Sequence, residues 1–142
     1  MKLVLLGFFG MLGVFARYFI GLASTRVFPS GFPYGTFIIN LTGCLAIGIV
    51  YALGYEKPVI SHDMRLVLMT GFLGGYTTFS AFGLESFLLF KNSNVTMGLV
   101  YLILSPILGF ATRATANGRS KSSQKQHQLS IKPIAQIHCS WR

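Results

Sequence analysis

Four long apolar stretches with almost no charged side chains limit what this chain can fold into. A helix needs about 20 residues to cross the hydrocarbon core of a bilayer, and each stretch has about that length. We place the spans at about residues 3–24, 35–55, 66–90 and 92–113. Only 11% of the 142 residues are charged, against roughly 25% in a typical soluble domain. The sequence therefore predicts an all-α membrane protein with four transmembrane helices, and argues against an ordinary soluble enzyme.

The formal net charge of +9 is concentrated after the last span. Residues 1–116 form the predicted four-span domain, whereas residues 117–142 carry basic side chains and no acidic one, which predicts a disordered basic tail. Four spans put both ends of the domain on one side of the membrane. That side collects Lys2, Lys57, Arg65, Arg113 and the tail, against Arg26 and Lys91 on the other. The positive-inside rule favours a cytoplasmic tail with anionic lipid as its neighbour. We expect no nucleic-acid partner, because neither a basic face nor a recognition motif is present.

Two of the spans carry a pair of polar residues four positions apart, a spacing that puts each pair on one helical face, and the first span carries Arg17 on such a row with Gly13 and Gly21. Arg17 lies inside the first span, Thr36 and Asn40 in the second, and Tyr101 and Ser105 in the fourth. A charged side chain in lipid is costly, so an aqueous path or vestibule is one interpretation. The alternatives are hydrogen bonds between neighbouring helices, and for Arg17 an extended side chain that reaches the interface.

The third span contains a string that does not favour an uninterrupted helix. Residues 71–82 read GFLGGYTTFSAF, with three glycines followed by the β-branched pair Thr77 and Thr78. This composition predicts a helix break near the bilayer centre. Unwound carbonyl groups at that depth commonly coordinate a cation. The alternative is close helix packing through Gly71 and Gly75, which have the GxxxG spacing.

Two aromatic residues follow the predicted break. Phe79 and Phe82 are three positions apart on one face, and the positive edges of their rings could meet an anion. Core packing is the commoner role of such a pair. Glu85, one turn later, is the only acidic residue inside a span, and a position near the membrane surface is its alternative interpretation.

These residues resemble the CrcB/Fluc family of fluoride channels. The similarity rests on residues 71–82 with Glu85, on GVFARY at residues 13–18, on residues 35–43 with Asn40, and on Tyr101 with Ser105. It covers about residues 5–113 and all four spans in order. Ala81 departs from the Thr usual in this family, Gly109 lacks a hydroxyl that some members have, and the tail matches nothing.

The resemblance implies a fluoride-specific ion channel that passively exports fluoride across the bacterial plasma membrane and so lowers its toxicity. It also implies an antiparallel, dual-topology homodimer, or a dimer with a paralogous subunit, with two pores and no enzymatic activity. A structural sodium ion would be held by the backbone carbonyls of Gly74 and Thr77.

The resemblance also implies roles for side chains along the pathway. Phe79 and Phe82 would line the anion path, and Asn40 and Ser80 would donate hydrogen bonds. The remaining expected residues are Tyr101 and Ser105 on a polar track, Arg17 in a vestibule, and Thr36 and Glu85 along the path or at its mouth.

Two other classes of membrane protein remain open from the residues. A small four-span multidrug exporter needs a membrane-embedded acid, in its case in the first span, where this chain has Arg17 instead. In a non-transporting assembly protein, Phe79 and Phe82 would only pack and the break would only join subunits. An intramembrane enzyme is disfavoured because His62, His127 and His138 all lie outside the spans.

Overall fold

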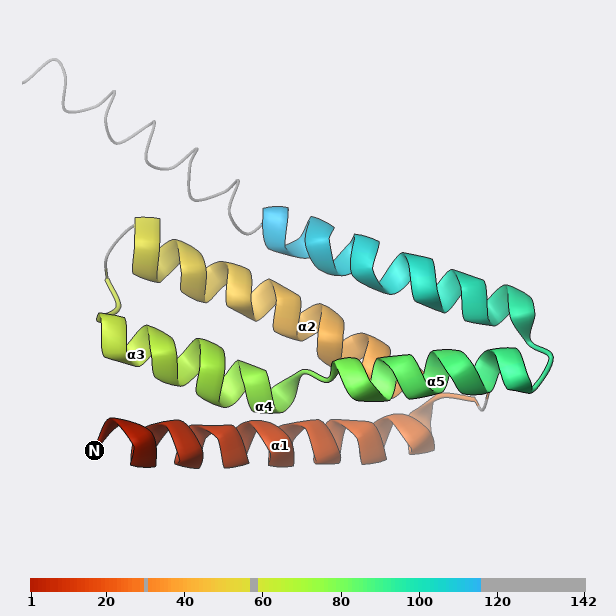
Figure 1. Ribbon diagram of the computed structural model, residues 1–142, viewed down its shortest axis with the longest axis horizontal. Helices are drawn as coiled ribbons and strands as arrows, with labels where there is room; N and C mark the ends of the chain where they lie inside the picture. Colours follow the sequence, from red (N-terminus) through yellow and green to blue (C-terminus); the bar gives the residue numbers. More distant parts are fainter. Residues whose placement is uncertain (30, 57–58, 116–142) are drawn as a thin grey trace, which may run out of the picture.

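The computed structural model describes residues 1–29, 31–56 and 59–115, and this part of the chain is helical with no strand (Figure 1). Four helices are long and apolar enough to cross a membrane: Lys2–Val27, Tyr34–Tyr55, His62–Lys91 and Val95–Thr115. Each runs antiparallel to the next, so the N-terminus and the end of the fourth helix lie at the same end of the bundle (Figure 1). The predicted all-helical, four-span fold is confirmed. The predicted tail, residues 117–142, lies outside the described residues.

The spans are built from shorter elements. α1 is Lys2–Val27, and α2, Tyr34–Tyr51, is continued by a π-helical stretch, Ala52–Glu56. The third span joins α3 (His62–Leu66), a π-helical stretch (Val67–Leu73), α4 (Gly74–Tyr76) and α5 (Phe79–Lys91). Between α4 and α5 the backbone is extended, with φ/ψ of −80/158° at Thr77 and −147/117° at Thr78. The third span is therefore interrupted at the two threonines; the depth of this point in a bilayer stays a prediction.

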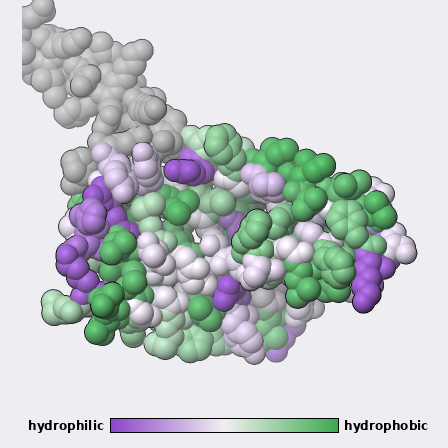
Figure 2. Space-filling view, viewed as in Figure 1, coloured by the Kyte–Doolittle hydropathy of each residue, from purple (hydrophilic) through white to green (hydrophobic). Residues whose placement is uncertain are grey.

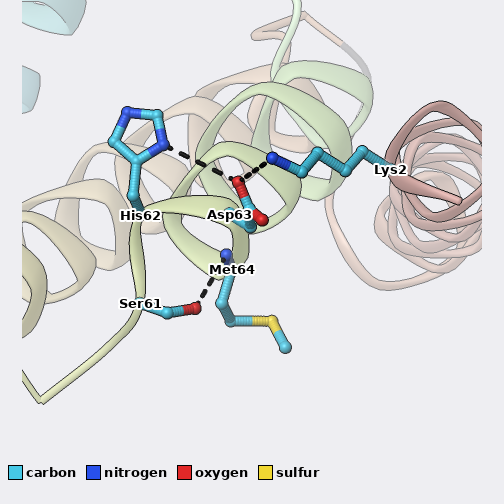
Figure 3. Close-up of polar contacts among 5 residues, drawn as sticks. All are labelled: Lys2, Ser61, His62, Asp63 and Met64. Atoms are coloured by element: carbon cyan, nitrogen blue, oxygen red, sulfur yellow. Dashed lines mark hydrogen bonds and ion pairs between the residues drawn. The ribbon is translucent and has the colours of Figure 1, made fainter.

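Three span boundaries differ by three or more residues from those expected. The first helix ends at Val27 rather than near residue 24. The fourth helix begins at Val95 rather than near residue 92, because Ser93 takes a left-handed conformation (φ 61°) that turns the chain. The third begins at His62 rather than near residue 66, since the Ser61 side chain caps it by accepting the Met64 N–H at 3.3 Å (Figure 3).

An ion pair joins the first and third spans at this end of the bundle. Lys2 Nζ lies 2.8 Å from Asp63 Oδ1, and His62 Nδ1 lies 3.8 Å from the same oxygen (Figure 3). The side chains are exposed, so the pair contributes little to the free energy of folding. It does leave Lys2 neutralised by a local acid.

Glycines allow α1 and the third span to touch backbone to backbone. A Cβ atom at Gly13 would lie against the Phe72 carbonyl oxygen and 2.8 Å from the Tyr76 nitrogen. A Cβ at Gly75 would overlap the Gly10 carbonyl, and one at Gly71 would lie 3.0 Å from the Leu6 carbonyl. The close packing considered for Gly71 and Gly75 is therefore present, and it stands directly before the interruption.

The outer surface is largely hydrophobic. Hydrophilic residues gather mainly at the two ends of the molecule, and hydrophobic ones cover much of the face between them (Figure 2). Large side chains such as Phe19, Phe87 and Phe110 are more than half exposed. Contact with lipid chains satisfies such a surface, as expected for a multi-pass membrane protein.

We expect Gly13→Ala to destabilise the bundle by about 1–3 kcal/mol, the usual cost of overpacking, because its Cβ meets backbone that cannot move aside. The thermal midpoint of the detergent-purified protein measures this effect. Gly7→Ala is the matched control on the same helix, since nothing lies within 4 Å of a Cβ there. Equal midpoints for the two variants would contradict the assigned contact.

Candidate functional site

The interruption in the third span is held by a side chain from α2. Asn40 Nδ2 donates to the Thr78 carbonyl at 3.0 Å, and the Thr78 N–H donates to Asn40 Oδ1 at 2.9 Å. One amide group therefore satisfies both polar groups of the Thr78 backbone, as a neighbouring strand would. The second hydrogen on Asn40 Nδ2 is not used by these bonds.

Two carbonyl groups lose their helical donors at this point. In a continuous α-helix the Thr78 N–H would face the Gly74 carbonyl, but here it donates to Asn40. The Ala81 N–H would face the Thr77 carbonyl, but it donates to the Thr78 hydroxyl at 3.2 Å and so caps α5. Gly74 and Thr77 are the residues whose carbonyls were expected to hold a cation. Among the described residues no cluster of His, Cys, Asp or Glu could hold a metal ion, so backbone oxygens are the ligands that this site offers.

The guanidinium group of Arg17 lies beside the interruption. Its Nη1 donates to the Thr77 carbonyl over 3.4 Å, and the side chain is half-buried. Arg17 is therefore directed into the bundle at the break and does not extend to a helix end. Because a carbonyl oxygen has two lone pairs, this long bond leaves it able to accept a second partner.

An uncharged groove opens on one side of the interruption; we call it the Phe groove. Its volume is about 360 Å³. It is lined by Asn40, Gly43, Cys44, Ile47, Met69, Leu73, Gly74, Thr77, Thr78, Phe79, Phe82, Ser105, Pro106, Gly109 and Phe110. Six residues predicted from the sequence meet here: Asn40, Gly74, Thr77, Phe79, Phe82 and Ser105.

The two phenylalanines of this groove differ in their surroundings. Their ring centroids are 5.8 Å apart with an interplanar angle of 40°. Phe82 is 9% exposed and packs on Tyr101, at 5.0 Å between centroids, whereas Phe79 is 83% exposed. In the single chain Phe82 is a fixed wall of the groove and Phe79 is an open one.

The two polar residues of the fourth span point to different partners. The Ser105 hydroxyl is buried at the Phe groove and has no hydrogen-bond partner among the described residues. Tyr101 is fully buried, and its hydroxyl donates to Glu85 Oε2 at 2.9 Å. The shared helical face therefore does not form one continuous row of hydroxyls.

Glu85 lies inside the bundle and accepts hydrogen bonds from two other spans. Thr36 Oγ1 donates to its Oε1 at 2.6 Å, while Tyr101 donates to its other oxygen. Thr36 and Tyr101 are buried, at 8% and 0% exposure, whereas Glu85 itself is half-buried. The depth of Glu85 in a bilayer stays a prediction.

A second, larger groove lies on the other side of the interruption, and we call it the Arg17 groove. Its volume is about 710 Å³. Predicted residues that line it are Arg17, Thr36, Ser80 and Glu85. Thr78 lines both grooves, and its hydroxyl lies 3.2 Å from that of Ser80. Apart from Tyr101, which lines neither groove, the predicted residues thus divide into two sets that meet at Thr78.

Thr78 is the central residue to which the sequence assigned no individual role. Its backbone is hydrogen-bonded to the Asn40 amide, its side chain caps α5, and it lines both grooves. Its position between a glycine-rich stretch and a helix start is a capping signal, and that signal could have identified it. The Thr42–Tyr76 contact, 2.8 Å between hydroxyl oxygens, had no comparable signal.

Comparison with known proteins shows the family to which this chain belongs. The model of the CrcB-like protein, Camphor Resistance (CrcB) family matches residues 4–117. A protein of Desulfotalea psychrophila named fluoride-specific ion channel FluC is 47% identical over 102 residues, covering 72% of this chain and 78% of its own. Proteins of the same name from Chloroflexus aurantiacus and Rhizobium johnstonii are 46% and 41% identical, covering 69% and 76% of this chain and 78% and 86% of their own. The chain belongs to the CrcB family.

Proposed function

We propose that this protein is a fluoride-specific ion channel that lets fluoride leave the cell passively. The observation that carries the proposal is the Phe groove, where Asn40, Phe79, Phe82 and Ser105 meet without a charged side chain. Relatives named as fluoride-specific channels support it at 41–47% identity.

The groove offers the donors that a strongly hydrated anion needs in exchange for water. Asn40 uses one N–H for the Thr78 carbonyl and keeps another for the ion, and the Ser105 hydroxyl has no partner among the described residues. Each hydrogen bond to an ion contributes roughly 1.5–3 kcal/mol. Ser80, with its exposed hydroxyl, is a third donor at the neighbouring groove.

The lining of the Phe groove has no charged side chain, and this favours conduction. A pore lined by Lys or Arg would hold an anion too tightly for it to leave, and conduction needs binding that is easily reversed. Edges of aromatic rings attract an anion only weakly and at short range. Phe79 and Phe82 are the residues we assign to this role.

The Arg17 groove has the features of an aqueous vestibule. The positive charge of Arg17 raises the local anion concentration at this mouth. Glu85 lines the same groove, but the hydroxyls of Thr36 and Tyr101 both donate to its carboxylate and offset its charge. Thr36 and Glu85 therefore belong to the mouth in this proposal.

An antiparallel dimer would complete the pathway. The Phe groove is open and Phe79 is 83% exposed, so a second surface is needed to enclose an ion there. A second copy of this chain, or a paralogous subunit, inserted with the opposite orientation is the partner we propose. Two such grooves in a dimer would give two pores.

A structural sodium ion fits the freed carbonyls. The Gly74 and Thr77 oxygens have lost their helical donors, and unwound carbonyls are the usual sodium ligands in membrane proteins. One chain supplies two of them, and a second copy would supply two more. Bound sodium would place a positive charge between two interrupted helices and join them.

Liposomes that contain the purified protein should release fluoride and retain chloride, as measured with ion-selective electrodes. Protein-free liposomes are the control. Equal fluoride and chloride release would reject fluoride specificity, and no release would favour a non-transporting assembly protein.

Replacing sodium by N-methylglucamine should lower the thermal midpoint of the protein, because an ion that joins two helices is lost.

Phe79→Ile and Phe82→Ile should each lower fluoride flux by orders of magnitude while leaving the oligomeric state unchanged, since the aromatic edges are lost but the apolar volume is largely kept. Phe87→Ile is the matched control, as Phe87 lies on the same helix and is 61% exposed away from both grooves. Flux similar to the wild type in both test variants would remove the rings from the pathway.

Asn40→Asp should abolish most of the flux. The carboxylate repels the anion, and it cannot donate to the Thr78 carbonyl that Asn40 Nδ2 now holds. The same liposome assay measures the loss. Asn94→Asp, the same chemical change in the exposed turn before the fourth helix, should conduct normally. If the two variants conduct equally, Asn40 is not part of the pathway.

A further inference from the structure

A stack of two arginines and two tyrosines lies at the end of the bundle that holds the N-terminus, and neither groove includes it. The rings of Tyr51 and Tyr55 are stacked, with centroids 4.8 Å apart and an interplanar angle of 27°. The Arg65 guanidinium lies over Tyr55, at 4.0 Å from the ring centroid, and that of Arg113 lies over Tyr51 at 5.6 Å. The stack therefore connects the second, third and fourth spans.

Arg65 is the fixed member of the stack. Its Nη1 donates to the Gly54 carbonyl at 2.6 Å, at the C-terminal end of the second span where backbone carbonyls lack helical donors. Its Nε is buried and has no hydrogen-bond partner among the described residues. A Cβ at Gly54 would overlap the Arg65 side chain, so this glycine makes room for it.

Arg113 is the accessible member. Its side chain is exposed, and it stands on the last turns of the fourth helix, close to where a membrane-spanning segment meets the headgroups. Tyr55 is also exposed, at 57%. Tyrosine is enriched at this level of a membrane because its ring is apolar and its hydroxyl is polar.

Most of the charged side chains that the structure describes at this end of the bundle are basic. At this end the described acidic side chain is Asp63, and it pairs with Lys2 (Figure 3). Among the residues whose side chains the structure describes, none forms an ion pair with Arg65 or Arg113. Within the described part of the chain, the exposed Arg113 guanidinium is therefore open to an anion at one membrane surface, and that of Arg65 lies on the same pair of tyrosines.

We propose that this stack binds the phosphate group of an anionic phospholipid. Guanidinium groups match the geometry of phosphate oxygens, and the lipid tails can lie along the exposed apolar helices beside the site. The basic tail of this chain does not fit, because residues 117–142 carry five basic and no acidic side chains. The same end of a second copy is equally basic, so the charge of the stack selects an anionic lipid.

The experiment measures the thermal midpoint of the full-length protein in a neutral detergent as palmitoyl-oleoyl phosphatidylglycerol is added. The zwitterionic phosphatidylcholine with the same chains is the comparison lipid. Phosphatidylglycerol should raise the midpoint at lower concentrations than phosphatidylcholine. Arg113→Gln should raise the phosphatidylglycerol concentration needed for this response roughly fivefold, which is the effect expected when one basic residue near an anionic surface is lost.

Matched variants separate the stack from charge in general. Arg26→Gln removes one exposed charge at the opposite end of the bundle and should leave the lipid response unchanged. Arg113→Lys keeps the charge without the planar group and should retain part of the response. This variant also tests the site if Arg113→Gln does not fold. A full-length variant with Lys121→Gln and Lys125→Gln tests the tail.

Four results would overturn the proposal. Arg113→Gln and Arg113→Lys could respond like the wild type, or Arg26→Gln could lose as much of the response as Arg113→Gln. The tail variant could lose the response while both Arg113 variants keep it, which would make the tail the lipid contact. Inorganic phosphate could raise the midpoint as strongly as phosphatidylglycerol at equal concentration, which would indicate a site for a soluble anion.

Discussion

The hydrogen bonds around Thr78 are the constraint on which the rest of the site depends. In a membrane, backbone N–H and C=O groups that leave a helix have no water to bind, and each unsatisfied group costs several kcal/mol. The Asn40 side chain forms hydrogen bonds with both the N–H and the carbonyl group of Thr78. The Thr78 side chain caps the next helix by accepting the Ala81 N–H. The interruption is therefore an ordered structure, and the freed carbonyls of Gly74 and Thr77 are its product.

The same point separates two environments of different charge. On one side lie Arg17 and Glu85, the positive group bonded to the Thr77 carbonyl and the negative group bonded to two hydroxyls. On the other side, the Phe groove contains no ionised side chain. In the proposed channel, charges would attract ions at the mouth, whereas the Phe groove would bind an ion through dipoles alone and without a fixed counter-charge.

Apolar length and backbone propensity are local properties, and they were sufficient for the four spans and for the interruption. The six residues that meet at the Phe groove were expected from the family resemblance. It was insufficient for hydrogen-bond partners, which depend on how helices rotate against each other. The helical spacing of Tyr101 and Ser105 was right, yet one hydroxyl turns to Glu85 and the other to the groove. The Arg–Tyr stack joins three spans, so no single segment could reveal it. The start of the fourth helix depends on one left-handed residue, Ser93, that composition does not indicate.

Phe79 and Phe82 look equivalent in the sequence, but their exposure shows that they cannot act alike within one chain. Three residues along a helix turn a side chain by 300°, so the two rings diverge by about 60°. Phe82 is fixed against Tyr101, whereas Phe79 faces outward at 83% exposure. An ion beside Phe79 would meet acyl chains if lipid covered the groove, and hydrocarbon offers it no hydrogen bond. Conduction along this groove therefore requires a second protein wall, and the proposed channel and the proposed dimer depend on the same surface.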